Sequence, residues 1–152
     1  MVTFKNIEDK DYLFIEKVYY STREKELNLT NWPEEQKRRF AIMQLIAQLA
    51  EYKNKFKGAT CQIIIYKKKP AGRLYLWESN KEVRILDISL LPEFQSKGIG
   101  RFILTAIIKS ARQKSKIVTL HVAHDNPAKK LYERVGFRKI SDNKTHEYME
   151  CI

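Results

Sequence analysis

The segment QSKGIGR at residues 95–101 places two glycines, two positions apart, where an apolar-periodic helix begins. Each glycine costs a helix about 1 kcal/mol relative to alanine, so the pair requires a physical reason. The first N–H groups of a helix lack intrahelical partners and lie at the positive end of its dipole, where they attract anions. Gln95, Lys97 and Arg101 offer further donors. The segment predicts a phosphate-binding turn, although glycines that only relieve crowding would look the same.

The rest of the chain predicts the elements that must hold this turn in place. Hydrophobic periodicity changes between a helical and a strand period along the sequence. The expected elements are a strand at 2–6, a helix from Asp9 to about Thr22, a helix from Asn31 to about Gly58, strands at 60–66, 72–78 and 82–91, a helix from 99 to about 115, a strand at 117–123, a short helix between Asn126 and Gly136, and strands at 137–141 and 145–151. The order predicts an α/β fold with a mixed sheet.

The helices have recognisable start signals and apolar faces. Asp9, Asn31 and Asn126 are expected to cap helices, and Pro33 and Pro127 suit a first turn. Residues expected on the apolar faces of the three longer helices are Leu13, Val18, Ile42, Leu45, Ile46, Leu49, Tyr52, Phe56, Ile99, Phe102, Ile103, Ala106 and Ile107.

Length and composition predict one soluble domain over residues 1–152. The mostly apolar stretches are far shorter than the ~20 residues that cross a bilayer, so no membrane association is expected. The N-terminus lacks an apolar leader, and Cys61 and Cys151 are too few for a disulfide framework. We therefore expect a cytoplasmic protein with reduced thiols. A homodimer is possible.

Net charge is the unusual feature, with 29 Lys and Arg against 18 Asp and Glu, or +11. Such a field attracts polyanions, either a phosphorylated cofactor or nucleic acid, although it can also serve solubility alone. Nucleic acid is the less favoured partner, because no recognised binding motif interleaves basic and aromatic residues.

Two longer segments, DISLLPEFQSKGIGRFIL and LHVAHDNPAKKLYERVGF, resemble the central and C-terminal motifs of the GNAT superfamily of acyl-CoA-dependent N-acetyltransferases. QSKGIG matches the Q/R-x-x-G-x-G/A signature of that family. The resemblance covers most of residues 60–150 and says little about the N-terminal helices. It implies a three-layer sandwich with a central mixed, mostly antiparallel sheet of about seven strands flanked by about four helices.

The resemblance also implies a cofactor, acetyl-CoA, and the residues that bind it. The diphosphate is expected on the signature turn, and the pantetheine arm is expected to pair with the backbone of the preceding strand, where the Leu90 N–H would stabilise the oxyanion. The implied cofactor-binding residues are Ile88, Leu90, Gln95, Ser96, Lys97, Gly98, Ile99, Gly100, Arg101, Asn126 and Tyr132.

Tyr132 matches the tyrosine that often protonates the leaving CoA thiolate in this family, although it could also be a core aromatic residue. The family asparagine usually stands seven residues before this tyrosine, where this chain has Asp125. Asn126 stands six before it. Either the loop is one residue tighter and Asn126 contacts pantetheine, or Asp125 takes that place and Asn126 only caps the helix. We favour Asn126 as a cofactor contact.

The base that deprotonates the amine has two candidates. His121 stands where some relatives carry a glutamate, and histidine titrates near neutrality. Asp87 is the second candidate, unless it only pairs with Arg84 or Arg73. His121 and His124 do not suggest a metal site, because residues three apart on a strand face opposite sides and no third ligand is evident.

Together these features predict a GNAT-type acetyltransferase that moves acetyl to a primary amine of a small molecule or protein, by direct attack in a ternary complex. The segment at 21–36 is expected to form a wall of the acceptor site, with Glu24, Glu26, Glu34 and Glu35 attracting a cationic amine. The alternatives are a basic nucleic-acid-binding protein and a CoA-binding regulatory module without turnover.

Overall fold

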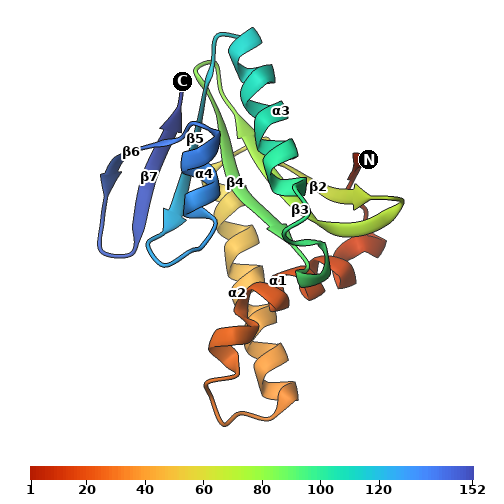
Figure 1. The fold of residues 1–152 in the computed structure, drawn as a ribbon. Coiled ribbons are helices and arrows are strands. Elements are labelled where there is room, and N and C mark those ends of the chain that lie inside the picture. Colours follow the sequence, from red (N-terminus) through yellow and green to blue (C-terminus); the bar gives the residue numbers. More distant parts are fainter. The chain divides into compact units, whose positions relative to one another are not determined.

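The computed structural model describes residues 1–152, and Figure 1 labels its helices and strands. The element order agrees with the order that the periodicity predicts. The strands are β1 (Val2–Asn6), β2 (Thr60–Tyr66), β3 (Lys69–Glu78), β4 (Glu82–Leu90), β5 (Ile117–Ala123), β6 (Arg138–Asp142) and β7 (His146–Cys151). The helices are α1 (Tyr12–Leu27), α2 (Glu34–Lys55), α3 (Ile99–Gln113) and α4 (Lys129–Val135), with short 3₁₀ turns η1 (Asp9–Asp11) and η2 (Pro92–Phe94).

The strands form a seven-stranded sheet in the order β1-β2-β3-β4-β5-β7-β6. β4 and β5 pair in parallel, with a register that runs from Glu82–Ile117 to Ile85–Leu120. Parallel neighbours need a long crossover connection, and α3 lies in that connection. The pairs β1–β2, β5–β7 and β6–β7 are antiparallel. The predicted mixed α/β fold is therefore confirmed.

Contacts between residues divide the chain into two compact units. β3 and β4 each have residues in both units. Unit 1 is Met1–Tyr75 with Asp87–Gln95, and unit 2 is Leu76–Leu86 with Ser96–Ile152. The expectation of a single domain over residues 1–152 stays a prediction.

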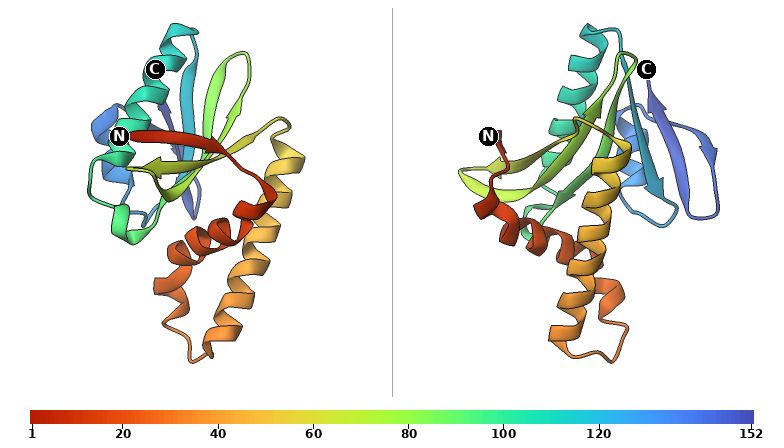
Figure 2. Two further views of the ribbon diagram at one scale, coloured as in Figure 1. Left: turned by 90° about the vertical axis from the view of Figure 1, so that its right-hand side faces the viewer. Right: turned by 180° about the vertical axis from the view of Figure 1, so that it is seen from behind.

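In unit 1, α1 and α2 form a helical hairpin that both views of Figure 2 show side by side. The hairpin buries its facing sides together with β2, because these are the faces on which large apolar residues recur at helical spacing. This core contains Ile15, Tyr19, Leu27, Ala41, Leu45 and Ile63.

In unit 2, the amphipathic helix α3 packs against β5. Alternate residues of β5 are apolar and buried, as expected for a strand with one face against a helix. The buried apolar side chains of this unit include Ile103, Leu104, Val118, Leu120 and Met149.

The start of α1 differs from the prediction. Asp9 begins a 3₁₀ turn, and the α-helix runs from Tyr12 to Leu27. The segment before α1 is held by the carboxylate of Asp11. Its Oδ2 accepts a hydrogen bond from the Glu8 N–H at 2.9 Å and one from the ammonium group of Lys5 at 2.9 Å. Hydrogen bonding to the Asp11 carboxylate therefore replaces the predicted cap.

Several predicted positions on the apolar faces are wrong. Leu13, Ile46 and Phe102 are 72%, 62% and 55% exposed, since each lies beside the buried row of its helix rather than on it. Asn31 does not cap α2 either, because Pro33 is the residue at that position and no side chain bonds there.

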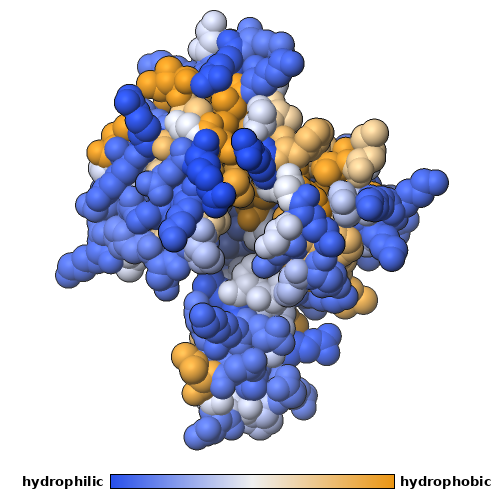
Figure 3. Space-filling model, viewed as in Figure 1, coloured by the Kyte–Doolittle hydropathy of each residue, from blue (hydrophilic) through white to orange (hydrophobic).

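Hydrophilic side chains cover most of the face drawn in Figure 3, and hydrophobic ones form smaller patches between them. Of the four α-helices, none combines the length and the apolar composition that a bilayer crossing requires.

Candidate active site

The signature turn of unit 2 has the conformation of an anion site. Gly98 is the N-cap of α3 with φ of 81°, in the left-handed region that glycine adopts without strain. Ser96 precedes it with φ of 60°. The first helical bond runs from the Phe102 N–H to the Gly98 carbonyl at 3.0 Å, and no side chain caps the end. The N–H groups at 99–101 therefore have no partner within the helix.

The two glycines serve different purposes. A Cβ atom on Gly98 would meet no heavy atom within 4 Å, so its backbone is open to a ligand. A Cβ on Gly100 would lie 3.3 Å from Leu131 Cδ2, so Gly100 lets α3 approach α4. The prediction of close approach to bare backbone thus fits Gly98, while crowding explains Gly100.

The short helix α4 places Tyr132 inside unit 2. Its ring is buried and packs edge-to-face on Phe137, with the ring centroids 5.8 Å apart. The carbonyl oxygen of the Asn126 side chain accepts the Ala128 N–H at 2.9 Å, which forms a turn before the helix. The N-cap of α4 is Ala128, so the prediction that Asn126 caps this helix is wrong. The helix ends at Gly136, whose φ of 117° again requires glycine. Cofactor contacts of Asn126 and Tyr132 stay predictions.

The last residues of β4 lie in unit 1. Asp87 pairs there with Arg73 of β3, with 2.7 Å between Oδ2 and Nε. Arg84, the other partner considered, bonds instead to Glu82 and Thr119 within unit 2. Gln95 donates its side-chain N–H to the Leu90 carbonyl at 3.0 Å, which braces the turn that follows the strand.

His121 on β5 stands opposite Tyr148 of β7, with ring centroids 5.0 Å apart. Burial lowers the pKa of His121 below its ordinary value, and the nearby charges of Arg84 and His146 lower it further, whereas Glu82 acts against the shift. The lowered pKa favours the neutral imidazole near neutral pH, which is the form that a base requires.

The structure thus distributes the predicted residues over both units. Unit 1 holds four of them within β4 and the turn after it, namely Asp87, Ile88, Leu90 and Gln95. Unit 2 holds the remaining ones, namely Ser96, Lys97, Gly98, Ile99, Gly100, Arg101, His121, Asn126 and Tyr132.

Two features of unit 1 were not singled out as functional from the sequence. Gly72 lets β3 approach β4, because a Cβ there would fall 2.0 Å from the Ser89 carbonyl oxygen. Arg73, beside it, is 1% exposed. An isolated Gly inside a strand was the available signal for the close backbone approach.

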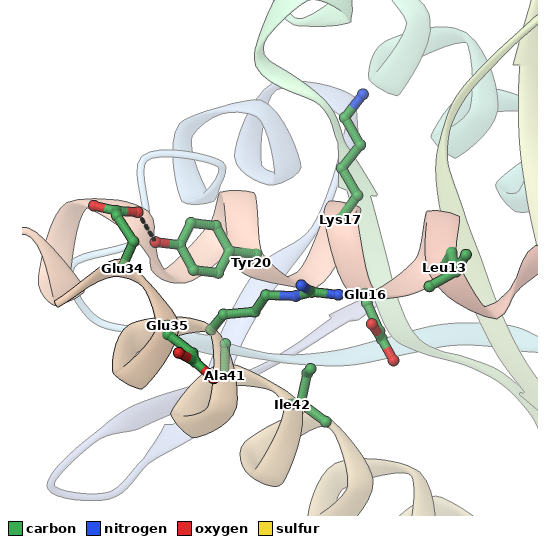
Figure 4. Close-up of a pocket in the computed structure, with 9 residues that line it drawn as sticks. Leu13, Glu16, Lys17, Tyr20, Glu34, Glu35, Ala41 and Ile42 are labelled. Atoms are coloured by element: carbon green, nitrogen blue, oxygen red, sulfur yellow. Dashed lines mark hydrogen bonds between the residues drawn. The ribbon is translucent and has the colours of Figure 1, made fainter.

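A cavity of about 500 Å³ lies between α1 and α2 within unit 1. Figure 4 shows Tyr20 and Glu16 entering from α1 and Glu34 and Glu35 from α2. The Tyr20 hydroxyl donates to Glu34 at 3.5 Å. The remaining lining residues are Leu13, Lys17, Arg38, Ala41 and Ile42. Two of the four predicted acceptor-wall glutamates, Glu34 and Glu35, therefore line a cavity.

Comparison with known proteins gives a consistent result. The family model described as "Acetyltransferase (GNAT) family" matches residues 12–137. A curated relative, the [ribosomal protein bS18]-alanine N-acetyltransferase of Haemophilus influenzae, is 30% identical over 66 residues, covering 43% of this chain and 45% of that protein. The match therefore spans less than half the length of this relative.

Solved structures show the same fold. PaiA N-acetyltransferase from Thermoplasma acidophilum, in complex with coenzyme A, superposes with a TM-score of 0.71 at 17% identity, over 99% of this chain and 98% of that one. A chimera of the spermidine N-acetyltransferase SpeG from Vibrio cholerae and hSSAT gives a TM-score of 0.65 at 21% identity, over 99% and 95%.

Proposed function

This chain belongs to the acetyltransferase (GNAT) family, and from that premise we propose that it transfers an acetyl group from acetyl-CoA to a primary amine. The reaction would be a direct attack of the amine on the thioester within a ternary complex. The observation that carries the proposal is the open N-terminus of α3, where Gly98 exposes helix N–H groups that no side chain caps. Such a terminus binds a diphosphate well.

Each unit, taken by itself, has its own proposed cofactor contacts. The N–H groups between Ser96 and Arg101 bind the diphosphate, with the basic side chains of Lys97 and Arg101 adding charge. The backbone of Ile88 and Leu90 pairs with the pantetheine arm. The Leu90 N–H is then the proposed donor to the thioester oxygen as negative charge develops there.

The proposed reaction forms one bond and breaks one. The amine lone pair attacks the acetyl carbon, the C–N bond forms, and the carbon–sulfur bond breaks as the tetrahedral intermediate collapses. The proton that the amine loses goes to a base, for which His121 is proposed. The Tyr132 hydroxyl gives a proton to the departing thiolate and recovers one from solvent.

His121 suits the role of base better than Asp87. A base must offer an unprotonated lone pair at working pH, and the lowered pKa of His121 favours a neutral ring there. The Asp87 carboxylate already accepts hydrogen bonds from Arg73 and from the Ser89 hydroxyl on one oxygen. Asp87 is therefore the weaker candidate for the base.

The His121→Gln variant is expected to lose about 10²-fold in kcat/KM at neutral pH, the usual contribution of a general base. In the wild-type protein the rate should fall as pH drops through the lowered pKa of His121, because protonation removes the base. The variant should lack this acidic limb. The measurement is a pH profile of thiol release at saturating acetyl-CoA.

His124→Gln provides the matched control. His124 follows the same strand, and its Nε2 contacts the Asn143 carbonyl oxygen at 2.7 Å rather than Tyr148. This variant should keep the wild-type profile. An unchanged acidic limb in His121→Gln would assign the base elsewhere.

The proposed acceptor is a cationic amine. Three glutamates line the cavity between α1 and α2, namely Glu16, Glu34 and Glu35, in a chain whose net charge is +11. They outnumber the two basic side chains of the same lining, Lys17 and Arg38. Carboxylates beside an apolar floor favour an ammonium group on a hydrocarbon chain. The relatives compared above act on an alanine amine in one case and are named for spermidine in another.

An acceptor screen tests the proposed function. Free thiol is measured with acetyl-CoA as donor and with spermidine, butylamine, an aminoglycoside, lysine peptides and a peptide with N-terminal alanine as acceptors. Thiol release that depends on the amine, with cationic amines preferred over neutral ones, is the expected result. Binding of CoA without thiol release from any amine would favour a regulatory CoA-binding module.

A further inference from the structure

Arg73 on β3 is the largest of the fully buried side chains, with 1% of its surface exposed. Removing a charged group from water carries a desolvation penalty of several kcal/mol. A leucine or methionine would fill this space without that penalty. A buried arginine in unit 1 therefore requires a specific partner and a purpose.

The contacts of Arg73 hold its guanidinium in one orientation. Its Nε donates to Asp87 Oδ2 at 2.7 Å, and its Nη2 donates to the side-chain oxygen of Gln48 on α2. The guanidinium carbon lies 5.8 Å from the ring centroid of Tyr19 and 5.9 Å from that of Tyr75. Nη1 has no partner. Burial has the largest single effect on the pKa of Arg73 and lowers it, but the charge and hydrogen bond of Asp87, together with Tyr52 and Cys61, raise the pKa overall.

Asp87 is the exposed end of this pair, since its side chain is 24% exposed. Its Oδ2 atom accepts from Arg73 and also from the Ser89 hydroxyl, at 2.8 Å. Both donors reach the same oxygen, so Oδ1 has no protein donor. The pair thus presents one open carboxylate oxygen from a rigid support.

The position of Asp87 on β4 places the Oδ1 atom near the backbone groups that are proposed to bind the thioester arm. Asp87 stands one residue before Ile88 and three before Leu90, the backbone positions proposed for the thioester arm. A strand advances about 3.3 Å per residue, so the carboxylate lies within about 10 Å of these groups along the chain. An amine that attacks the thioester must pass through the same neighbourhood.

We propose that Asp87 Oδ1 binds the ammonium form of the acceptor, and that Arg73 is the positioning residue that holds the carboxylate for it. This inference rests on the proposed function. Asp87 then selects charged amines. The proposed base, and not Asp87, removes the proton of the ammonium group before the attack. Arg73 acts only through Asp87, so its effect should disappear once the Asp87 charge is gone.

If the ion pair of Arg73 and Asp87 only stabilises the fold, the variants should behave differently. In that case Arg73 joins α2 to β3, and its replacement would lower the melting temperature and disturb all substrates alike. The two explanations are separated by comparing a charged with an uncharged amine, because only the first can pair with a carboxylate. Butylamine is protonated at neutral pH, whereas aniline is not.

The experiment compares the wild-type chain with Arg73→Met, Asp87→Asn and the double variant. KM and kcat for butylamine and for aniline are measured by thiol release. Calorimetry gives the affinity for CoA and, on the CoA-bound chain, for butylamine. The control is Lys55→Met, since Lys55 also forms an ion pair within unit 1, with 3.0 Å between its Nζ and Glu51 Oε1, and this pair does not include Asp87.

Each single variant is expected to raise KM and the calorimetric dissociation constant for butylamine about ten- to a hundredfold, as for a lost charged hydrogen bond. Parameters for aniline and the affinity for CoA should stay unchanged, and the double variant should be no worse than Asp87→Asn. Lys55→Met should behave as wild type.

Equal losses for butylamine and aniline, additive effects in the double variant, or unchanged butylamine binding would each overturn the proposal. Failure of the proposed function has a different signature, which is a wild-type chain that binds no CoA. In that case butylamine is titrated into the free chain and the variants, and equal binding by all of them overturns the role of Asp87.

Discussion

Tyr132→Phe is expected to lower kcat about 10²- to 10⁴-fold, the range that a general acid contributes, while the affinity for CoA changes little. The substitution removes one hydroxyl and keeps the ring. Because that ring is buried and packs on Phe137 at 5.8 Å, the fold should tolerate the change. The loss should therefore appear in the chemical step.

The measurement is steady-state thiol release with calorimetric titration of CoA on the same samples. Tyr148→Phe is the matched control, since Tyr148 lies in the same unit and its hydroxyl donates to Glu150 at 2.8 Å. We expect the control to keep kcat within a few fold. If Tyr132→Phe retains full turnover, water or another group protonates the thiolate, and Tyr132 is only a core residue.

Saturating CoA should raise the melting temperature of the wild-type chain by about 5–11 °C. A ligand at a hundred times its dissociation constant adds about 2.7 kcal/mol to the stability of the native state. For a chain of this size, 1 kcal/mol moves the midpoint by about 2–4 °C. The measurement is thermal unfolding at fixed salt, with and without CoA.

The glycine turn can be tested in the same assay with two matched variants. Gly98 and Gly58 have nearly equal φ values, 81° and 85°, and a Cβ on either would meet nothing within 4 Å. Alanine at each should therefore cost a similar ~1–2 kcal/mol of backbone strain. Only Gly98→Ala should also weaken CoA binding, by roughly tenfold or ~1.4 kcal/mol, because its methyl group covers the N–H groups of α3.

Equal CoA-dependent shifts in the two variants would contradict the diphosphate site at the start of α3. A smaller shift in Gly98→Ala alone would support it, since the strain is the same in both. This comparison separates loss of the ligand from loss of stability.

Local sequence patterns were enough to predict the element order and the position of the turn. The strand at 117–123 agrees residue for residue with β5, and the glycine at 136 ends α4 as expected. These features depend on a few neighbouring residues, because periodicity and the left-handed preference of glycine act over one or two turns of chain. The family signature added the cofactor for the same reason, as a short contiguous motif.

The partners of the site residues were decided by the tertiary structure alone. Asp87 had Arg73 and Arg84 as alternative partners, and the structure pairs it with Arg73, 14 residues away on β3. Which arginine meets the carboxylate depends on how β3 and β4 lie side by side, with Gly72 allowing their backbones to approach. No local spacing encodes that arrangement.

The same distinction explains the errors on the helices. Leu13, Ile46 and Phe102 share the helical spacing of the buried residues, yet they face solvent because nothing packs over them. Apolar periodicity identifies a helix and a range of faces, whereas burial requires a second surface brought there by distant parts of the chain. The sequence by itself therefore determined the elements and the glycine turn before α3, and long-range packing decided which side chains meet.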